Sequence, residues 1–231
     1  MALDGCNAAP RGRRRSTTDG TDVTDEDETF SLSRPLCIRV IRAIRGHFRL
    51  REHPLMSLSL EVVDSSSLSP SARRQVLDLC SEAYEEDFSE YLRLLGPGVH
   101  VLGWIDSILV SQAMWVTRWL QPGGRAALET AYVEAVATRA AYRRRGFASE
   151  ILARLAVEIR AFDLGALSPT DAGFYQRLGW ELWRGPLFVR TNEGLESTPD
   201  ESVMILRLPR TPADLDSSES LSAEWRRGEV W

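Results

Sequence analysis

The chain has 231 residues, of which 43% are hydrophobic, and a formal net charge of −5. This length suits one substantial core or at most two small ones, and the negative charge argues against a nucleic-acid partner. All 28 basic residues are arginine, which excludes a lysine Schiff-base mechanism. The three scattered cysteines, Cys6, Cys37 and Cys80, show neither metal nor disulfide spacing, which favours a cytoplasmic protein. No apolar run reaches membrane-spanning length, so we expect no membrane partner for the folded part.

The first 55 residues differ in composition from the rest of the chain. Residues 1–33 join a basic cluster to an acidic run, a pattern typical of disorder. Residues 34–51 alternate apolar and arginine side chains, which predicts a basic amphipathic helix for a membrane surface or a partner. Alternatively, translation starts at Met56 and the extension is an annotation artefact. In both cases residues 56–231 form the folded domain.

The first part of this domain predicts a strand, two helices and a hairpin. Ser69 is interpreted as a helix N-cap because proline follows it at the first helical position. Cys80 falls on the apolar face of that helix and is interpreted as a small buried residue. The predicted elements are a strand at 58–63, a helix from Pro70, a short helix at 91–95, and strands at 99–105 and 108–119.

Residues 130–138 predict a central strand, because both of its alternating faces are largely apolar. A basic turn with Gly146 follows and opens a helix whose apolar residues recur at helical spacing from Phe147 to Phe162. The free N–H groups of a first helical turn and the helix dipole favour an anion, and nearby arginines add charge-assisted hydrogen bonds. We therefore predict an anion site at this turn; the alternative is an arginine-rich helix start that faces water.

The remaining elements complete a mixed α/β sandwich. Ser168 is interpreted as the N-cap of a helix with Pro169 in its first turn, and the helix ends at Gly179. The predicted strands of this part lie at 164–167, 180–183, 187–191 and 203–208.

The pattern Arg-x-x-Gly-x-Ala at residues 143–148 resembles the pyrophosphate loop of the GNAT superfamily of acyl-CoA-dependent N-acyltransferases. From about residue 58 onward, the chain further resembles the aminoglycoside 2′-N-acetyltransferases of that superfamily. The matching pieces are residues 86–88, 132–135, 142–146, 164–168, 174–175, 179–180 and 225–231. The resemblance implies a GNAT-like α/β fold: a mostly antiparallel sheet that splays between the fourth and fifth strands, with helices on both faces.

The resemblance implies acetyl-CoA as co-substrate and no metal. The pantetheine arm is implied to pair with the backbone of Val136, Ala137 and Thr138; the alternative is that these residues make ordinary ladder hydrogen bonds. The pyrophosphate is implied to lie on the basic turn, formed by Arg143, Arg144, Arg145, Gly146, Phe147 and Ala148. Ala148 replaces the second glycine of many relatives.

The implied acceptor is a polycationic aminoglycoside, and the charge of the folded part agrees in sign. Ten arginines and eight acidic residues precede Met56, which leaves 18 Arg against 25 Asp and Glu, a net −7. The resemblance nominates as substrate-binding residues Asp87, Glu134, Ala135, Ser168, Asp200, Glu201 and Trp231. Alternatively, Asp87 ends a solvated turn, Ser168 only caps a helix, and Asp200 and Glu201 belong to a polar loop.

Two residues are candidates for proton transfer. Glu134 lies in an apolar strand, where an acid is costly without a partner; it is implied to accept the amine proton directly or through water, and the alternative is a structural acid paired with an arginine. Tyr175 is implied to protonate the departing CoA; the alternative is an aromatic core residue. No cysteine lies near these motifs, so we expect direct transfer without an acyl-enzyme.

Three functions remain open at this point. The chain acetylates the 2′-amine of aminoglycosides and so confers antibiotic resistance; or it acetylates another amine, such as a polyamine, a protein N-terminus or a cell-wall amino sugar; or it binds CoA or the antibiotic without turnover. The resemblance also leaves a homodimer open.

Overall fold

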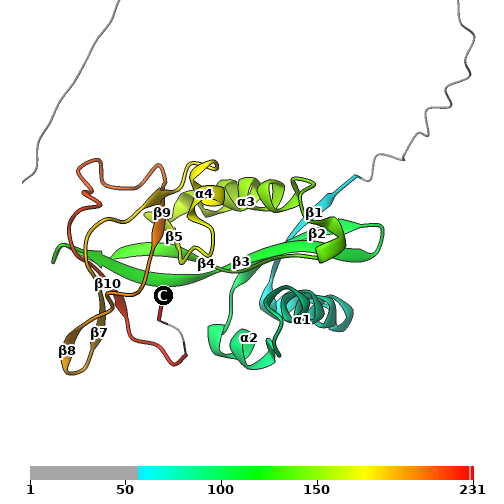
Figure 1. Ribbon diagram of the computed structural model, residues 1–231, viewed down its shortest axis with the longest axis horizontal. Coiled ribbons are helices and arrows are strands. Elements are labelled where there is room, and N and C mark those ends of the chain that lie inside the picture. The colour runs from blue at the N-terminus through cyan, green and yellow to red at the C-terminus, as the bar shows by residue number, and fades with distance from the viewer. Residues whose placement is uncertain (1–56, 229) are drawn as a thin grey trace, which may run out of the picture. The chain divides into compact units, whose positions relative to one another are not determined.

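A computed structural model describes residues 57–228, 230 and 231. The predictions for the first 55 residues, including the helix at 34–51 and the start at Met56, lie outside the described residues. Within the described part, ten strands join in one sheet that has helices on both faces (Figure 1). Among these residues, no helix is both long and apolar enough to span a bilayer.

The sheet is mostly antiparallel. Its strand order is β6-β9-β5-β4-β3-β10-β7-β8, and β2 and β1 continue from the first half of β3. Only the β4–β5 and β10–β7 pairs are parallel. The bounds are β1 (Ser59–Asp64), β2 (Val99–Ile105), β3 (Ile108–Pro122), β4 (Leu128–Thr138), β5 (Leu164–Leu167), β6 (Glu181–Leu182), β7 (Leu187–Thr191), β8 (Gly194–Ser197), β9 (Met204–Arg207) and β10 (Leu221–Glu224).

Four helices cover the two faces. In Figure 1, α3 and α4 lie on one face of the sheet, and α1 and α2 lie on the other. Their bounds are α1 (Pro70–Tyr84), α2 (Ser89–Leu95), α3 (Phe147–Glu158) and α4 (Ala172–Gln176). Because both faces of β4 are covered, the strand is buried along most of its length, as its apolar pattern predicted.

Helix starts show where cap predictions hold and where they fail. The Ser69 hydroxyl accepts a hydrogen bond from the Ala72 amide at 3.1 Å, so the predicted cap of α1 is confirmed. The predicted cap of α4 at Ser168 is wrong. Asp171 caps that helix instead, because its side chain accepts from the Phe174 amide at 3.2 Å. Residues 168–170 are therefore a loop between β5 and α4.

A bulge in β4 decides the shape of the site. The register shifts between the pairs Gln112–Ala137 and Met114–Glu134, so Ala135 and Val136 lie opposite the single residue Ala113. Pairing of β4 with β5 ends at the pair of Tyr132 with Ala166. Beyond Tyr132, residues 133–138 of β4 have no β5 partner. The predicted splay between the fourth and fifth strands is thus confirmed.

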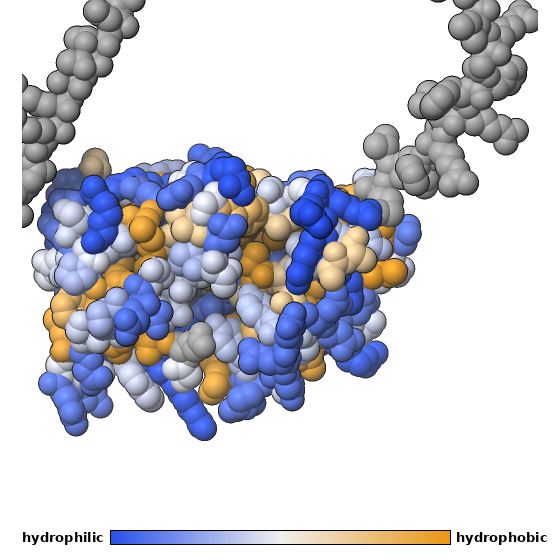
Figure 2. Space-filling model, viewed as in Figure 1, coloured by the Kyte–Doolittle hydropathy of each residue, from blue (hydrophilic) through white to orange (hydrophobic). Residues whose placement is uncertain are grey.

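Large apolar side chains also reach the surface of the described part. Figure 2 shows exposed apolar residues over the end of the sheet that holds β7 and β10, beside hydrophilic surface elsewhere on the same face. The most exposed large apolar residues of β3, β8 and the segment after β10 are Trp119, Leu195 and Trp225. The homodimer stays a prediction.

Candidate active site

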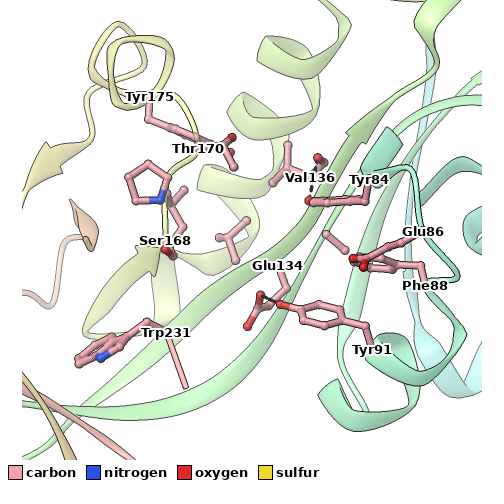
Figure 3. A pocket seen from close by; sticks show the side chains of 14 residues that line it. Tyr84, Glu86, Phe88, Tyr91, Glu134, Val136, Ser168, Thr170, Tyr175 and Trp231 are labelled. Atoms are coloured by element: carbon pink, nitrogen blue, oxygen red, sulfur yellow. Dashed lines mark hydrogen bonds between the residues drawn. The ribbon is translucent and has the colours of Figure 1, made fainter. Parts of the chain in front are cut away.

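A cavity of about 220 Å³ opens where β4 and β5 separate. Its walls are the unpaired part of β4, the loop after β5, Tyr175 on α4, the segment from α1 to α2, and the C-terminal Trp231 (Figure 3). These pieces are far apart in the sequence. Of the residues predicted for catalysis or substrate binding, the cavity brings together Glu134, Ala135, Ser168, Tyr175 and Trp231.

Glu134 is buried in the β4 wall and makes two hydrogen bonds. Its Oε1 accepts from Arg226 Nη2 at 2.6 Å, and its Oε2 accepts from the Tyr91 hydroxyl at 2.9 Å. Burial raises the pKa of the Glu134 carboxyl above its ordinary value, and the Arg226 guanidinium and the Tyr91 hydroxyl oppose that rise. The carboxylate therefore meets both interpretations: it lines the cavity, and it is paired with an arginine.

The C-terminal segment is fixed to the sheet by Arg118, which is almost fully buried in β3. Arg118 Nε donates to Glu224 Oε1 at 3.0 Å, Nη2 donates to the Glu224 carbonyl at 2.7 Å, and Nη1 donates to the Val230 carbonyl. The indole Nε1 of Trp231 donates to Thr198 Oγ1 at 2.8 Å. These bonds hold Trp231 at the cavity and, with it, the segment that carries Arg226.

Two arginines also face Tyr132, whose ring is completely buried between the sheet and this segment. The guanidinium carbons of Arg118 and Arg226 lie 5.1 and 5.8 Å from the ring centroid. Burial, reinforced by the charge of Glu134, raises the pKa of the Tyr132 hydroxyl, so the group stays protonated. Tyr132 therefore supports the floor of the site without an ionised group of its own.

Tyr175 forms the opposite wall of the cavity (Figure 3). Its ring packs edge-on against Phe174 and Trp180, with centroids 5.1 and 6.2 Å away. Burial, reinforced by the charge of Asp171, raises the pKa of the Tyr175 hydroxyl to about 12. The hydroxyl makes no hydrogen bond within the described ranges, so it is a protonated donor available to a ligand. Ser168 lies exposed at the rim of the same wall.

Asp87 does not line the cavity, whereas its neighbour Glu86 does. The Asp87 carboxylate is fully exposed and accepts from the Ser89 amide at 3.0 Å. Its hydrogen bonds with the side chain and then the amide of Ser89 lower the pKa of the carboxyl. Asp87 thus stabilises the first turn of α2. Its substrate-binding role stays a prediction, and Glu86 is an acidic wall residue that the sequence analysis did not name.

Asp200 and Glu201 also lie outside the lining, in an exposed turn between β8 and β9. The Glu201 amide donates to the carbonyl of Thr198 at 3.2 Å, so this turn also holds the hydroxyl that binds the Trp231 indole. The charge of Glu201 contributes to the raised pKa of Tyr132. The turn therefore borders the site, and the substrate-binding roles of Asp200 and Glu201 stay predictions.

The three predicted pantetheine residues face different neighbours. The Arg139 amide donates to the Val110 carbonyl of β3 at 2.9 Å, so by the alternation of an antiparallel ladder Ala137 also turns its backbone toward β3. Ala137 thus fits ordinary ladder pairing. Thr138 is in the alternate position of the ladder, and its carbonyl accepts from Arg143 Nε at 3.2 Å. The Val136 carbonyl accepts from the Tyr84 hydroxyl at 3.2 Å.

The predicted pyrophosphate turn has the features of an anion site. Gly146 has a φ of +88° and precedes α3, a helix of 12 residues whose N-terminus no side chain caps. Arg143, Arg144 and Arg145 are exposed around it, and Arg145 lies over the Tyr142 ring at 5.3 Å. Phe147 is buried and anchors the helix start, with Ala148 beside it in the first turn.

Within the described ranges, no group of three or more His, Cys, Asp or Glu side chains is arranged to hold a metal ion.

Comparisons with known proteins identify the family. The family described as acetyltransferase (GNAT) domain matches residues 65–183, just over half of the chain. An aminoglycoside 2′-N-acetyltransferase from Mycolicibacterium fortuitum is 34% identical over 178 residues, which cover 74% of this chain and 90% of that protein. This chain belongs to the aminoglycoside 2′-N-acetyltransferase family of the GNAT superfamily. It is an N-acetyltransferase, as the sequence predicted.

One solved structure supports the fold of this acetyltransferase, and a second is similar over a shorter part. The GNAT family N-acetyltransferase YhbS from Escherichia coli, crystallised in complex with CoA, matches 75% of this chain and 92% of its own at 17% identity and a TM-score of 0.52. Eis1 from Mycobacterium abscessus matches 57% of this chain at 19% identity and a TM-score of 0.49. This chain spans only about a third of Eis1 (33%).

Proposed function

We propose that this acetyltransferase transfers the acetyl group of acetyl-CoA directly to the 2′-amine of an aminoglycoside, in the cytoplasm, and so confers resistance to the antibiotic. One observation carries the proposal: the open edge of β4 and an acidic cavity meet at Glu134, with Tyr175 and Trp231 on the other walls. The relative from M. fortuitum, which carries this activity in its name, supports the choice of acceptor.

The acetyl donor is proposed to lie along the gap between β4 and β5. Val136 and Thr138 lie in the part of β4 that has no β5 partner, so their backbone could pair with the pantetheine arm as with a missing strand. Their carbonyls would exchange the side-chain hydrogens of Tyr84 and Arg143 for those of the donor. The turn of Arg143, Arg144 and Arg145 and the uncapped start of α3 would hold the pyrophosphate. The donor would then run from the basic turn toward the cavity, with its thioester end at Glu134.

The acceptor is proposed to bind through carboxylates. Glu86 and Glu134 lie on the cavity wall, and the net charge of −7 on residues 56–231 attracts a polycation. An ammonium that enters must share Glu134 with Arg226, which keeps the carboxylate in place before the substrate arrives. The exposed turn with Asp200 and Glu201 would meet distant rings of a larger aminoglycoside.

Glu134 and Tyr175, on facing walls of the cavity, are proposed to carry the two proton transfers of the reaction. Glu134 accepts a proton from the 2′-ammonium, directly or through one water, and the neutral amine attacks the thioester carbonyl. As the carbon–sulfur bond breaks, the thiolate of CoA takes the proton of the Tyr175 hydroxyl, whose raised pKa keeps it protonated beforehand. The nitrogen then gives up its second proton, which returns to the Tyr175 phenolate directly or through water, and the proton on Glu134 passes to solvent. The acetyl group thus moves from sulfur to nitrogen in one transfer.

A panel of amines tests the proposed acceptor. Release of CoA is expected with tobramycin and gentamicin and not with amikacin, because amikacin has a hydroxyl in place of the 2′-amine. The assay is run on the intact chain and on a version that starts at Met56. Turnover only with a polyamine, a peptide N-terminus or a cell-wall amino sugar would support the alternative acceptor. Binding without turnover, unchanged by Glu134→Gln, would support a non-enzymatic role.

A further inference from the structure

A buried polar chain, separate from the cavity, ends on the bulge of β4. Its central residue is Gln112 of β3, which has no solvent exposure. The Nε2 of Gln112 donates to the carbonyl of Ala135 at 2.6 Å, and the Oε1 accepts from Nδ1 of His100 at 3.0 Å. A buried amide is costly unless its groups are paired, so a glutamine here calls for a reason.

The partners of Gln112 fix the orientation of its amide. A backbone carbonyl only accepts, so the amide N–H of Gln112 must face Ala135 and the amide oxygen must face His100. Nδ1 of His100 then carries the hydrogen. Burial lowers the pKa of His100 and favours the neutral ring. Its Nε2 lies 3.1 Å from the hydroxyl oxygen of Ser65, which donates its own hydrogen to the Gly98 carbonyl at 2.9 Å. The amide of Gln112 is thus held on both sides, by His100 and by Ala135.

The chain ends on a strained residue of the site. Ala135 has a φ of +51° and is buried. A residue with a Cβ rarely adopts this left-handed conformation and keeps it only where its surroundings hold it. The strain lies at the bulge, where it sets the directions of Glu134 before it and Val136 after it.

We propose that Gln112 is a positioning residue for acetyl transfer. Its amide holds the Ala135 carbonyl, and thereby the left-handed bulge, so that the Glu134 carboxylate faces the acceptor and the Val136 backbone faces the donor. The inference rests on the proposed roles of these two residues. Packing alone does not account for Gln112, because its side chain makes its shortest contact with the strained carbonyl and none with the ligand cavity.

A double-mutant cycle tests this proposal, because glycine adopts the left-handed conformation without strain. Gln112→Met keeps the size of the side chain and removes its hydrogen bonds with Ala135, His100 and Cys80. We expect kcat/KM for acetyl-CoA to fall by about 10²-fold. Gln112→Met should cost about tenfold less in kcat/KM when it is introduced into Ala135→Gly than when it is introduced into the unchanged chain. His100→Leu, which frees the Gln112 amide, should give a smaller loss with the same rescue.

A control variant separates positioning from general loss of stability. Ile159→Ala opens the core at the end of α3, away from the bulge, and Ala135→Gly should not rescue it. CoA affinity, measured by calorimetry, needs no acceptor, so it tests Gln112 even if aminoglycosides prove not to be the substrates. Three results would overturn the proposal. Ala135→Gly could rescue Ile159→Ala as well as it rescues Gln112→Met, or it could fail to rescue Gln112→Met. Gln112→Met could also leave both CoA affinity and kcat unchanged.

Discussion

The variant Glu134→Gln is expected to lower kcat for acetyl transfer to tobramycin by about 10²–10⁴-fold, the range of a lost general base. The amide keeps the size of the side chain and still accepts from Arg226 or Tyr91, so KM for acetyl-CoA should change little. Steady-state kinetics at saturating acetyl-CoA measures both parameters. A loss confined to KM would instead assign Glu134 to ground-state binding alone.

The pH dependence of kcat/KM tests the role of Glu134 as a base. Below the pKa of Glu134 the carboxyl is protonated and cannot accept a proton, so kcat/KM rises as the pH passes through that pKa. Because burial raises this pKa, the rise falls above the ordinary range of glutamate. The rise should be absent in Glu134→Gln.

Arg226→Gln is the matched control, because it breaks the same ion pair from the other side. Loss of the guanidinium removes an effect that lowers the pKa of Glu134, so the acid limb should move to higher pH while activity returns above it. A purely structural pair would give the opposite picture: both variants would lose activity at every pH, in proportion to their loss of thermal stability.

The variant Tyr175→Phe is expected to lower kcat by about 10²-fold, because the thiolate then leaves without a proton donor. The phenyl ring keeps the contacts with Phe174 and Trp180, and the hydroxyl makes no hydrogen bond within the described residues. The free energy of unfolding should therefore change by less than about 1 kcal/mol. Kinetics and a thermal melt of the same preparation measure the two effects.

A second acyl donor sharpens this test. A thioester with a more acidic thiol needs less help in leaving, so the loss caused by Tyr175→Phe should shrink with that donor. An equal loss with both donors would assign Tyr175 to packing, and so would no loss with acetyl-CoA.

Sequence patterns predicted strands best where turn residues bound a short apolar run. The predictions for residues 99–105, 164–167 and 187–191 coincide with β2, β5 and β7. Two strands were missed for opposite reasons: β8 is fully exposed and has no apolar face, whereas β10 is short and forms only because β3 and β7 enclose it. Pairing with remote strands leaves little trace in local sequence.

Site residues could be predicted where burying the side chain costs unusual free energy or where the residue belongs to a motif that resembles the family. Glu134 stood out as an acid in an apolar strand, and the cavity indeed contains it. Its partner Arg226 lies 92 residues further along the chain, and no local pattern links the two. Gln112 likewise gives no local signal, because its partner Ala135 lies on another strand, at the bulge. The sequence also did not show which acid of this loop lines the cavity. Asp87 accepts a hydrogen bond from the first turn of α2, and Glu86 lines the cavity instead.

A crystal structure of the enzyme with CoA and tobramycin tests the central claim most directly. We expect the pantetheine arm in the gap beyond Tyr132, hydrogen-bonded to the backbone of Val136 and Thr138, and the pyrophosphate on the turn before α3. The 2′-amine should lie within hydrogen-bond reach of Glu134, directly or through one water, with Trp231 beside the sugar. A β4–β5 gap left empty while CoA binds elsewhere, or a 2′-amine remote from Glu134, would contradict the account.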